Sequence, residues 1–239
     1  MKISVVIPAY NEESRIPKTL EAVSEYLSGR YDYEIIVVDD GSADATAEIC
    51  ARFLESGERG RVIRNSRNRG KGFSVRRGML EADGELILFS DADMSTPIRE
   101  LEKLVRAVEG GADIAVGSRG LPESDIRVHQ RFPRESMGKC FNILVRFAAV
   151  PGIMDTQCGF KLFRRECARV IFKIAALEKF SFDVEVLFIA RRSGFKIKEV
   201  PVTWVNSEAS RVNVMTDPLR MFFDIFYIRF LSLAGRYNR

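Results

Sequence analysis

Short apolar runs alternate with helical patterns through the first half of the chain. The runs lie at residues 3–7, 34–38, 61–64, 86–89 and 114–116, the one at 61–64 being the weakest. Between them, apolar residues recur at helical spacing and predict helices around 16–27, 47–53, 72–80 and 97–108. Short strands that alternate with helices are typical of a mostly parallel sheet covered by helices on both faces. The pattern therefore predicts an α/β fold.

The second half is less regular. A polar, arginine-rich stretch follows Gly120, and the pattern then predicts a helix at 141–150, a strand at 159–163, a helix at 184–190 and an alternating strand at 197–205. No internal repeat, low-complexity tract or linker separates the two halves. We therefore expect residues 1–215 to form one unit.

The segment 216–239 is expected to form a C-terminal aromatic helix. One helical face carries six large apolar side chains: Leu219, Phe222, Phe223, Phe226, Phe230 and Leu233. Core packing is the default interpretation of such a stripe, and a membrane-surface helix is the competing one, because Arg229 and Arg236 lie beside the aromatic face. Asp224 and Arg229 interrupt the run, so we do not expect this helix to span a bilayer.

Composition excludes several kinds of site. The single histidine, His129, is incompatible with metal centres built from several histidines. The four cysteines contain no Cys-x-x-Cys pair, so neither a zinc knuckle nor a disulfide scaffold is expected. The apolar run at 3–7 is too short for a signal-peptide core or a membrane span. The net charge of +4 alone does not indicate a nucleic-acid binder.

The strongest single motif is Asp91-Ala92-Asp93, which directly follows a predicted strand. Two carboxylates one residue apart can supply oxygen ligands to Mg²⁺ or Mn²⁺. A solvated turn or a cap for the following helix is the alternative. The pair Asp39-Asp40 ends another strand, and we favour Asp40 as a ligand of a nucleotide while leaving the role of Asp39 open.

These acidic loops are expected to converge. In parallel sheets, ligands bind beyond the carboxyl ends of the strands, where Asn11, Asp40, Asp91 and Asp93 would lie. The sequence therefore predicts a single crevice at that edge.

Basic residues gather in two parts of the chain. Eight lie between Arg59 and Arg77 without one acid, and they are open to three interpretations: a solvated face, donors to a phosphorylated ligand, or a nucleic-acid patch. The last is weakest because no aromatic residues suited to stacking bases are interleaved. The second group suits a phosphorylated acceptor, with surface solvation as the alternative: Arg119, Arg127, Arg131, Arg134, Lys139, Lys161 and Arg211.

Four ordered motifs give a more specific indication: 8–13 (PAYNEE), 38–42 (VDDGS), 68–72 (NRGKG) and Asp91-Ala92-Asp93. Together they resemble the family 2 glycosyltransferases, which have a nucleotide-sugar-binding α/β fold of the GT-A type and invert the anomeric centre. The segments 155–161 (DTQCGFK) and 182–185 (FDVE) are similar to those of the branch that glycosylates dolichyl phosphate, most of all its β-glucosyltransferases. The resemblance implies a donor half at 1–118 and an acceptor half at 119–215.

The resemblance also implies roles for individual residues. Asp91 and Asp93 would hold the metal. Ser95 stands where the related mannose synthases usually have glutamine, so the third metal ligand is left open. The donor-binding residues would be Pro8, Tyr10, Glu12, Asp40, Lys71, Asp91, Ala92, Asp93 and Arg119. The acceptor phosphate would be bound by Arg119, Arg131, Arg134, Ser136 and Arg211.

Catalysis on a lipid monophosphate needs no dedicated base, because the phosphate is already largely ionised near neutral pH. Asp93, Arg134 and Arg211 would then act by positioning and by charge neutralisation. A hydroxyl acceptor would need a carboxylate base, for which Asp183 and Glu185 are the candidates. Asp183 is equally open to a structural role.

The resemblance thus implies an inverting transferase that moves glucose from UDP-glucose to dolichyl or another polyprenyl phosphate, with Mg²⁺ or Mn²⁺. We expect it to act peripherally at the cytoplasmic face of a membrane, with or without a separate membrane-anchoring partner, and without binding nucleic acid. Three alternatives remain open at this stage: a GDP-mannose donor, a soluble hydroxyl acceptor, and a non-catalytic nucleotide-sugar sensor.

Overall fold

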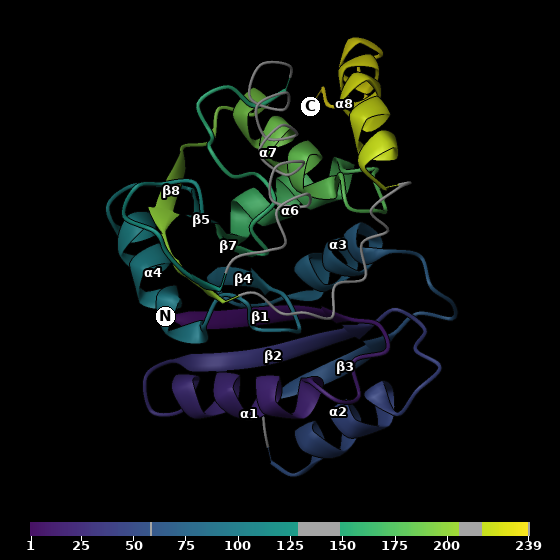
Figure 1. Cartoon of the computed structure of the whole chain (residues 1–239), viewed down its shortest axis with the longest axis vertical. Helices are drawn as coiled ribbons and strands as arrows, with labels where there is room; N and C mark the ends of the chain where they lie inside the picture. The colour runs from purple at the N-terminus through teal and green to yellow at the C-terminus, as the bar shows by residue number, and fades with distance from the viewer. Residues whose placement is uncertain (58, 129–148, 206–216, 239) are drawn as a thin grey trace.

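The structure is a computed structural model that describes residues 1–57, 59–128, 149–205 and 217–238. Its centre is a seven-stranded sheet in the order β3-β2-β1-β4-β7-β5-β8 (Figure 1). All neighbouring strands are parallel except where β7 pairs antiparallel with β4 and β5. The strands are β1 (Lys2–Ala9), β2 (Asp32–Asp39), β3 (Gly60–Arg64), β4 (Leu86–Ser90), β5 (Ile114–Ser118), β7 (Phe160–Arg164) and β8 (Ile197–Pro201).

Helices cover both faces of this sheet. Successive strand residues point to opposite sides, and because the residues on both sides are apolar, each face packs against its own set of helices. In β1, Val5 and Ile7 pack with α1 (Ile16–Leu27), α2 (Thr46–Glu55) and α4 (Leu101–Glu109). The intervening residue, Val6, packs on the other face with a second set of helices. That set is α3 (Lys71–Glu81), α6 (Arg165–Ile174), α7 (Phe182–Arg192) and α8 (Asp217–Leu233). The predicted α/β fold with a mostly parallel, doubly covered sheet is confirmed.

Several elements differ from the predicted order. The segment 197–205 forms two strands, β8 and β9 (Thr203–Val205), because the chain leaves the main sheet after Pro201. β9 pairs with β6 (Asp125–Val128) in a separate two-stranded sheet. Helix α6 was not predicted, and a short 3₁₀ turn at Ile98–Glu100 precedes α4. Most of the predicted helix at 141–150 lies outside the described residues.

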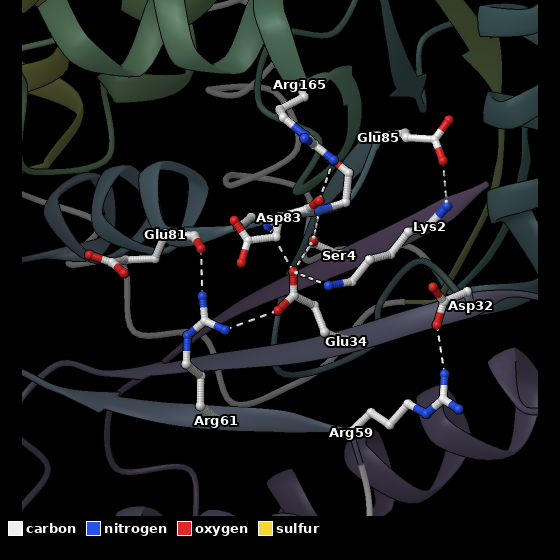
Figure 2. Close-up of polar contacts among 12 residues, drawn as sticks. Lys2, Ser4, Asp32, Glu34, Arg59, Arg61, Glu81, Asp83, Glu85 and Arg165 are labelled. Atoms are coloured by element: carbon white, nitrogen blue, oxygen red, sulfur yellow. Dashed lines mark hydrogen bonds and ion pairs between the residues drawn. The ribbon is translucent and has the colours of Figure 1, made fainter.

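The amino ends of the central strands form a structural ion-pair cluster (Figure 2). Glu34 of β2 is buried, and its carboxylate accepts hydrogen bonds from the Ser4 hydroxyl at 2.6 Å and the Asp83 N–H at 2.7 Å. Lys2 Nζ lies 3.6 Å and Arg61 Nη1 3.0 Å from the same carboxylate. The four groups that contact Glu34 link β1, β2, β3 and the residue Asp83 at the amino edge of the sheet. The polar groups at this edge therefore have a structural role.

Helix α8 buries its isoleucine face and not the aromatic stripe that was expected to pack in the core. Ile225 and Ile228 of α8 are the residues buried in the core. Exposed large side chains are Phe222, Phe223, Phe226, Tyr227, Phe230 and Leu233. The prediction that the aromatic stripe packs in the core was therefore wrong, because the narrower isoleucine face packs with α7 and its neighbours in the core. In the part of the chain that the structure describes, no helix has the length and apolarity needed to cross a membrane.

Candidate active site

The loops after β1 and β2 are joined directly. Asn11, in the first loop, has a positive φ of 51°. Its N–H donates to the Ser42 hydroxyl at 2.9 Å, and its side-chain oxygen accepts the Ala43 N–H at 2.9 Å. A positive φ in a residue other than glycine is held by its surroundings, and asparagine tolerates it better than most residues. The convergence of these two loops at the carboxyl edge, predicted from the sequence, is confirmed.

Asp40 fixes the next loop in place. Its carboxylate accepts the Asn65 side-chain amide at 2.7 Å and the N–H groups of Arg69 and Gly70 at 3.0 and 2.7 Å. The side chain is buried. Three donors from the protein therefore bind the carboxylate that we expected to bind a nucleotide. In this structure the Asp40 carboxylate holds the loop at 68–72 in place.

The loop at 68–72 packs closely on the segment 177–182. Gly70 has a φ of 111°, and a Cβ there would lie 2.5 Å from the Glu178 carbonyl oxygen. A Cβ at Gly72 would lie 2.5 Å from the Leu177 carbonyl oxygen. Arg69 also forms an ion pair with the Glu178 carboxylate. Glycines are needed at both positions because two backbones meet there, which explains the Gly-Lys-Gly pattern without a Walker loop.

Asp91 lies against the start of β7. Because β7 is antiparallel, its first residues lie at the same edge as the last residues of β4, and the Asp91 N–H donates to the Gly159 carbonyl at 3.1 Å. A Cβ at Gly159 would lie only 2.0 Å from Asp91 Oδ2. The glycine of the 155–161 motif therefore leaves the space that the Asp91 carboxylate occupies.

The other members of the motif are equally constrained. The Ala92 carbonyl accepts the Thr19 hydroxyl at 2.6 Å, and Asp93 Oδ1 accepts the Ser95 N–H at 3.0 Å. Ser95 in turn accepts the Val205 N–H at 2.8 Å through its carbonyl. The motif is thus held from α1 and from β9, with the Asp93 side chain half-buried.

Lys71 supplies a cation inside this site. Its Nζ lies 2.6 Å from Asp91 Oδ1 and 5.2 Å from the centre of the Phe89 ring. Burial lowers the pKa of Lys71, but the carboxylates of Asp91 and Asp183 outweigh it and raise the pKa above its usual value. Burial raises the pKa of Asp91, although the Lys71 ammonium acts in the opposite direction. Lys71 is therefore charged and placed beside the carboxylate that we expect to face a diphosphate.

Asp183 forms a buried ion pair with Lys161. The side chain of Lys161 is 1% exposed, and its ammonium contacts the Asp183 carboxylate and the Cys158 carbonyl, the latter at 2.6 Å. A buried charge needs such a partner. The pairing favours the structural interpretation of Asp183, since the carboxylate is already engaged by a cation that holds β7 against α7.

Glu185 is enclosed even more completely. Its side chain has no exposed surface, and it accepts the N–H groups of Ala176 and Leu177 and the Tyr237 hydroxyl, at 2.6 Å. Burial raises its pKa. The idea that Glu185 is a base for a hydroxyl acceptor is wrong, because no substrate can reach it in this structure; it holds the end of α6 and the C-terminal segment.

Arg119 directly follows β5 and is bound by Asp155. Its Nε and Nη2 lie 2.6 and 2.9 Å from the two carboxylate oxygens, and the Arg119 N–H donates to Oδ2 at 3.0 Å. The guanidinium also lies 5.4 Å from the Trp204 ring centre. Burial opposes ionisation of Asp155, but Arg119 outweighs it and lowers the carboxyl pKa. A partly exposed guanidinium is thereby fixed at the carboxyl edge, where it can face a phosphate.

The predicted site residues divide into three groups. The structure brings Asp40, Lys71, Asp91, Asp93 and Arg119 to one edge of the sheet. Pro8, Tyr10 and Glu12 lie at the end of β1, where the Glu12 carboxylate pairs with Arg15 at 2.6 Å. Four residues predicted for the acceptor site lie outside the described residues, as do His129 and Lys139: Arg131, Arg134, Ser136 and Arg211.

The basic window at 59–77 is mostly paired within the protein. Arg59, Arg61 and Arg64 contact the carboxylates of Asp32, Glu34 and Asp39, respectively. Arg76 and Arg77 donate to backbone carbonyls. These arginines therefore make ion pairs and backbone hydrogen bonds around β3 and α3, which differs from the solvated face, the phosphate donors and the nucleic-acid patch expected from the sequence.

A divalent cation fits the chemistry of the donor set at Asp91 and Asp93. The two carboxylates lie one residue apart on a constrained turn, and Gly159 keeps the space around Asp91 free of a side chain. Within the described residues, however, no group of three or more histidine, cysteine, aspartate or glutamate side chains could hold a metal. A cation bound here would need further oxygen ligands, such as a diphosphate or water.

Comparisons of structure show what this architecture is similar to. Glucosyl-3-phosphoglycerate synthase from Mycobacterium tuberculosis, solved with Mn²⁺ and UDP-glucose, superposes with a TM-score of 0.68 at 22% identity, covering 98% of this chain and 79% of that chain. Mannosyl-3-phosphoglycerate synthase from Rubrobacter xylanophilus gives 0.70 at 20% identity, covering 100% and 76%. At this identity the similarity shows the fold, which is the predicted GT-A type.

Comparisons of sequence reach further. Dolichyl-phosphate β-glucosyltransferase from Dictyostelium discoideum is 37% identical over 98% of this chain and 75% of its own length. The human enzyme of the same name is also 37% identical, over 99% and 78%, and the Saccharomyces cerevisiae one 35%, over 99% and 76%. The model of the glycosyl transferase family 2 matches residues 4–172. The chain therefore belongs to glycosyl transferase family 2.

Proposed function

We propose that this transferase moves glucose from UDP-glucose to dolichyl or another polyprenyl phosphate, with inversion at the anomeric carbon. The support is threefold: the names of near full-length relatives, the paired carboxylates at the end of β4, and fixed cations around them. The observation that carries the proposal is the placement of Asp91 beside both Lys71 and Gly159, which joins the donor motifs to the 155–161 motif.

The chemistry follows from the charges. A phosphate oxygen of the acceptor attacks the anomeric carbon, the bond from that carbon to the diphosphate breaks, and UDP leaves with the electron pair. Asp91 and Asp93 would hold Mg²⁺ or Mn²⁺, which neutralises charge on the departing diphosphate. Lys71 adds a second positive charge near Asp91. The acceptor needs no base, in keeping with the engaged carboxylates of Asp183 and Glu185.

The acceptor side is assigned to the other arginines. Arg119, fixed by Asp155, would face a phosphate from the end of β5. Arg131, Arg134, Ser136 and Arg211 complete the proposed acceptor site. Because polyprenyl phosphates reside in bilayers, we propose that the protein works peripherally at the cytoplasmic face of a membrane, with or without an anchoring partner.

A donor competition tests the proposal. The purified protein is incubated with equal amounts of UDP-glucose and GDP-mannose, Mn²⁺ and a polyprenyl phosphate. The mass of the lipid product is measured by mass spectrometry. Glucose and mannose add the same mass to the lipid, so the glucose of UDP-glucose is labelled with ¹³C. We expect the label of UDP-glucose in the lipid. Predominant incorporation from GDP-mannose would contradict the proposed donor. A parallel reaction also contains a soluble hydroxyl acceptor, and labelling of that acceptor alone would contradict the proposed lipid acceptor.

A further inference from the structure

The segment at 202–205, which includes β9, joins two loops of the candidate active site. At its start, the Val202 N–H donates to the Ser118 carbonyl at the end of β5, at 3.4 Å. At its end, the Val205 N–H donates to the Ser95 carbonyl at 2.8 Å, in the turn that follows the acidic pair. Backbone hydrogen bonds therefore link the loop after β5 to the loop after β4.

Trp204, the single tryptophan of the chain, lies between these two bonds. Its side chain is 8% exposed, and the Arg119 guanidinium lies 5.4 Å from the centre of its ring. The strand that carries the ring is paired with β6, where Ile126 lies opposite Trp204. Among the described residues, Trp204 belongs to neither of the two apolar clusters that cover the main sheet. Its burial therefore arises at the carboxyl edge and not in either core.

The Arg119 guanidinium is held on two sides and open on a third. The Asp155 carboxylate binds Nε and Nη2 along one edge, at 2.6 and 2.9 Å, and the Trp204 ring contacts the same group. Within residues 1–57, 59–128, 149–205 and 217–238, Nη1 has no hydrogen-bond partner. The side chain is 26% exposed. The donors of Nη1 can therefore bind an anion, and guanidinium groups bind phosphate well.

The charge of Arg119 is coupled to the acidic pair. Burial lowers the pKa of Arg119, but the Asp155 carboxylate outweighs burial and Asp91 adds to its effect, so the pKa is raised. Arg119 is therefore protonated, and it interacts electrostatically with Asp91. A phosphorylated substrate at this edge would meet that positive charge as well as any cation held by Asp91 and Asp93.

We propose that Trp204 is a positioning residue for glucosyl transfer. Its indole fixes the Arg119 guanidinium so that Nη1 faces a substrate phosphate, and the segment at 202–205 keeps this donor in register with the turn of Asp91 and Asp93. A cation beside an aromatic ring is attracted to it, and a charge that is already fixed needs no reorganisation when the substrate binds. The inference rests on the proposed function, in which both substrates carry phosphate.

Ligand binding tests the role of the indole without turnover. Calorimetry measures the affinity of UDP in the presence of Mn²⁺ and, separately, of a short-chain polyprenyl phosphate. We expect Trp204→Leu to weaken binding of at least one of them about tenfold, and Trp204→Phe, which keeps an aromatic ring, to stay within about threefold of the wild type. A loss for UDP assigns Arg119 to the donor, and a loss for the polyprenyl phosphate assigns it to the acceptor. Unchanged affinity for both ligands would overturn the proposal.

A double-mutant cycle separates positioning from packing. If the indole acts through Arg119, Trp204→Leu should change ligand affinity much less in an Arg119→Ala background than in the wild type. An equal loss in both backgrounds would overturn the proposal, because Trp204 would then act independently of Arg119. Tyr26→Leu is the matched control, since that ring lies 4.8 Å from the Arg30 guanidinium outside the site. This variant should bind both ligands like the wild type.

Fluorescence tests the wild-type protein, whether or not Trp204→Leu folds. Tryptophan emission reports on this position alone, because the chain has one tryptophan. A phosphate bound at Nη1 of Arg119 changes the charge beside the indole, so we expect the emission to shift on saturation with the ligand that calorimetry identifies. Arg119→Ala should abolish most of the shift. Unchanged emission of the wild type with both ligands would contradict the proposal.

Kinetics separate this inference from the proposed function. With UDP-glucose and a polyprenyl phosphate, Trp204→Leu should lower kcat/KM about tenfold or more, and Trp204→Phe should retain most of the wild-type value. If the wild type forms no glucosyl lipid but ligand affinity still depends on Trp204 through Arg119, the proposed function fails and the positioning role stands. If Trp204→Leu forms glucosyl lipid at the wild-type rate, with equal ligand affinities, the positioning role alone fails.

Discussion

The space that Gly159 leaves empty is occupied by the carboxylate of Asp91: a Cβ at position 159 would lie 2.0 Å from Asp91 Oδ2. We therefore expect Gly159→Ala to displace this carboxylate while the fold persists. A displacement of about 1 Å in a reacting site costs about 100-fold in rate, so kcat/KM should fall by about that factor. Steady-state kinetics and thermal unfolding measure the two effects. Gly110→Ala, at a glycine with a negative φ, is the control, and equal kinetics of both variants would contradict the assignment.

Lys71 would compete with a divalent cation for Asp91, since its Nζ lies 2.6 Å from Oδ1. Lys71→Met removes that positive charge. We expect Mn²⁺ to bind the donor-free protein about tenfold more tightly, corresponding to about 1.4 kcal/mol of lost repulsion. Turnover should fall nevertheless, because the diphosphate loses a cation. Calorimetric titration with Mn²⁺ gives the first quantity, and Lys71→Arg serves as the charge-conserving control. Weaker Mn²⁺ binding by Lys71→Met would count against this competition.

Lys161 and Asp183 form an ion pair in the interior. Removing one partner leaves a buried charge, so Asp183→Asn and Lys161→Met should each lower the free energy of unfolding by about 3–5 kcal/mol. The double variant Lys161→Met, Asp183→Leu should lose less than the sum of the two. Urea unfolding provides all three values. Asp32→Asn breaks an exposed pair with Arg59 and should cost less than about 1 kcal/mol; a similar cost for both pairs would refute the distinction.

The ionisation of Glu34 makes the free energy of unfolding depend on pH. Burial opposes its ionisation, but bonds from Ser4 and Asp83 and the charges of Lys2 and Arg61 outweigh burial and lower its pKa. A carboxyl whose pKa is lower in the folded than in the unfolded state stabilises the fold above the unfolded pKa, about 4.3, and this stabilisation is lost as the pH falls through the folded pKa.

We therefore expect the free energy of unfolding to decline below about pH 4.3, and Glu34→Gln to show a shallower decline between that pH and the folded pKa. Chemical unfolding at a series of pH values measures both curves. Glu81→Gln, whose backbone carbonyl rather than its side chain contacts Arg61, is a suitable control. Parallel curves for the wild type and Glu34→Gln would show that Glu34 does not carry the dependence.

Much of the fold was predictable because its strands are buried on both sides. Continuous apolar runs marked β1, β2 and β4, and their carboxyl ends marked the positions of Asn11, Asp40 and Asp91. The antiparallel insertion of β7 between β4 and β5 was not predictable, since strand direction depends on pairing across the whole sheet rather than on local pattern.

Other features depend on contacts that no local pattern contains. Lys161 looked like a surface cation until its pairing with Asp183 placed it in the core. The aromatic face of α8 looked like core because large rings are usually buried, whereas the isoleucines on the other face meet the protein. In both cases the outcome depends on residues far away in the sequence.

We propose that a cation held by Asp91 and Asp93 supports glucosyl transfer to a lipid phosphate. The most direct measurement is the initial rate of glucosyl-lipid formation from UDP-glucose and a polyprenyl phosphate, by mass spectrometry of the lipid. The rate is compared with Mn²⁺, with excess chelator, and with Asp93→Asn. We predict product with Mn²⁺ and a loss of at least about 100-fold in the other two conditions. Undiminished product in chelator and in Asp93→Asn would contradict the claim.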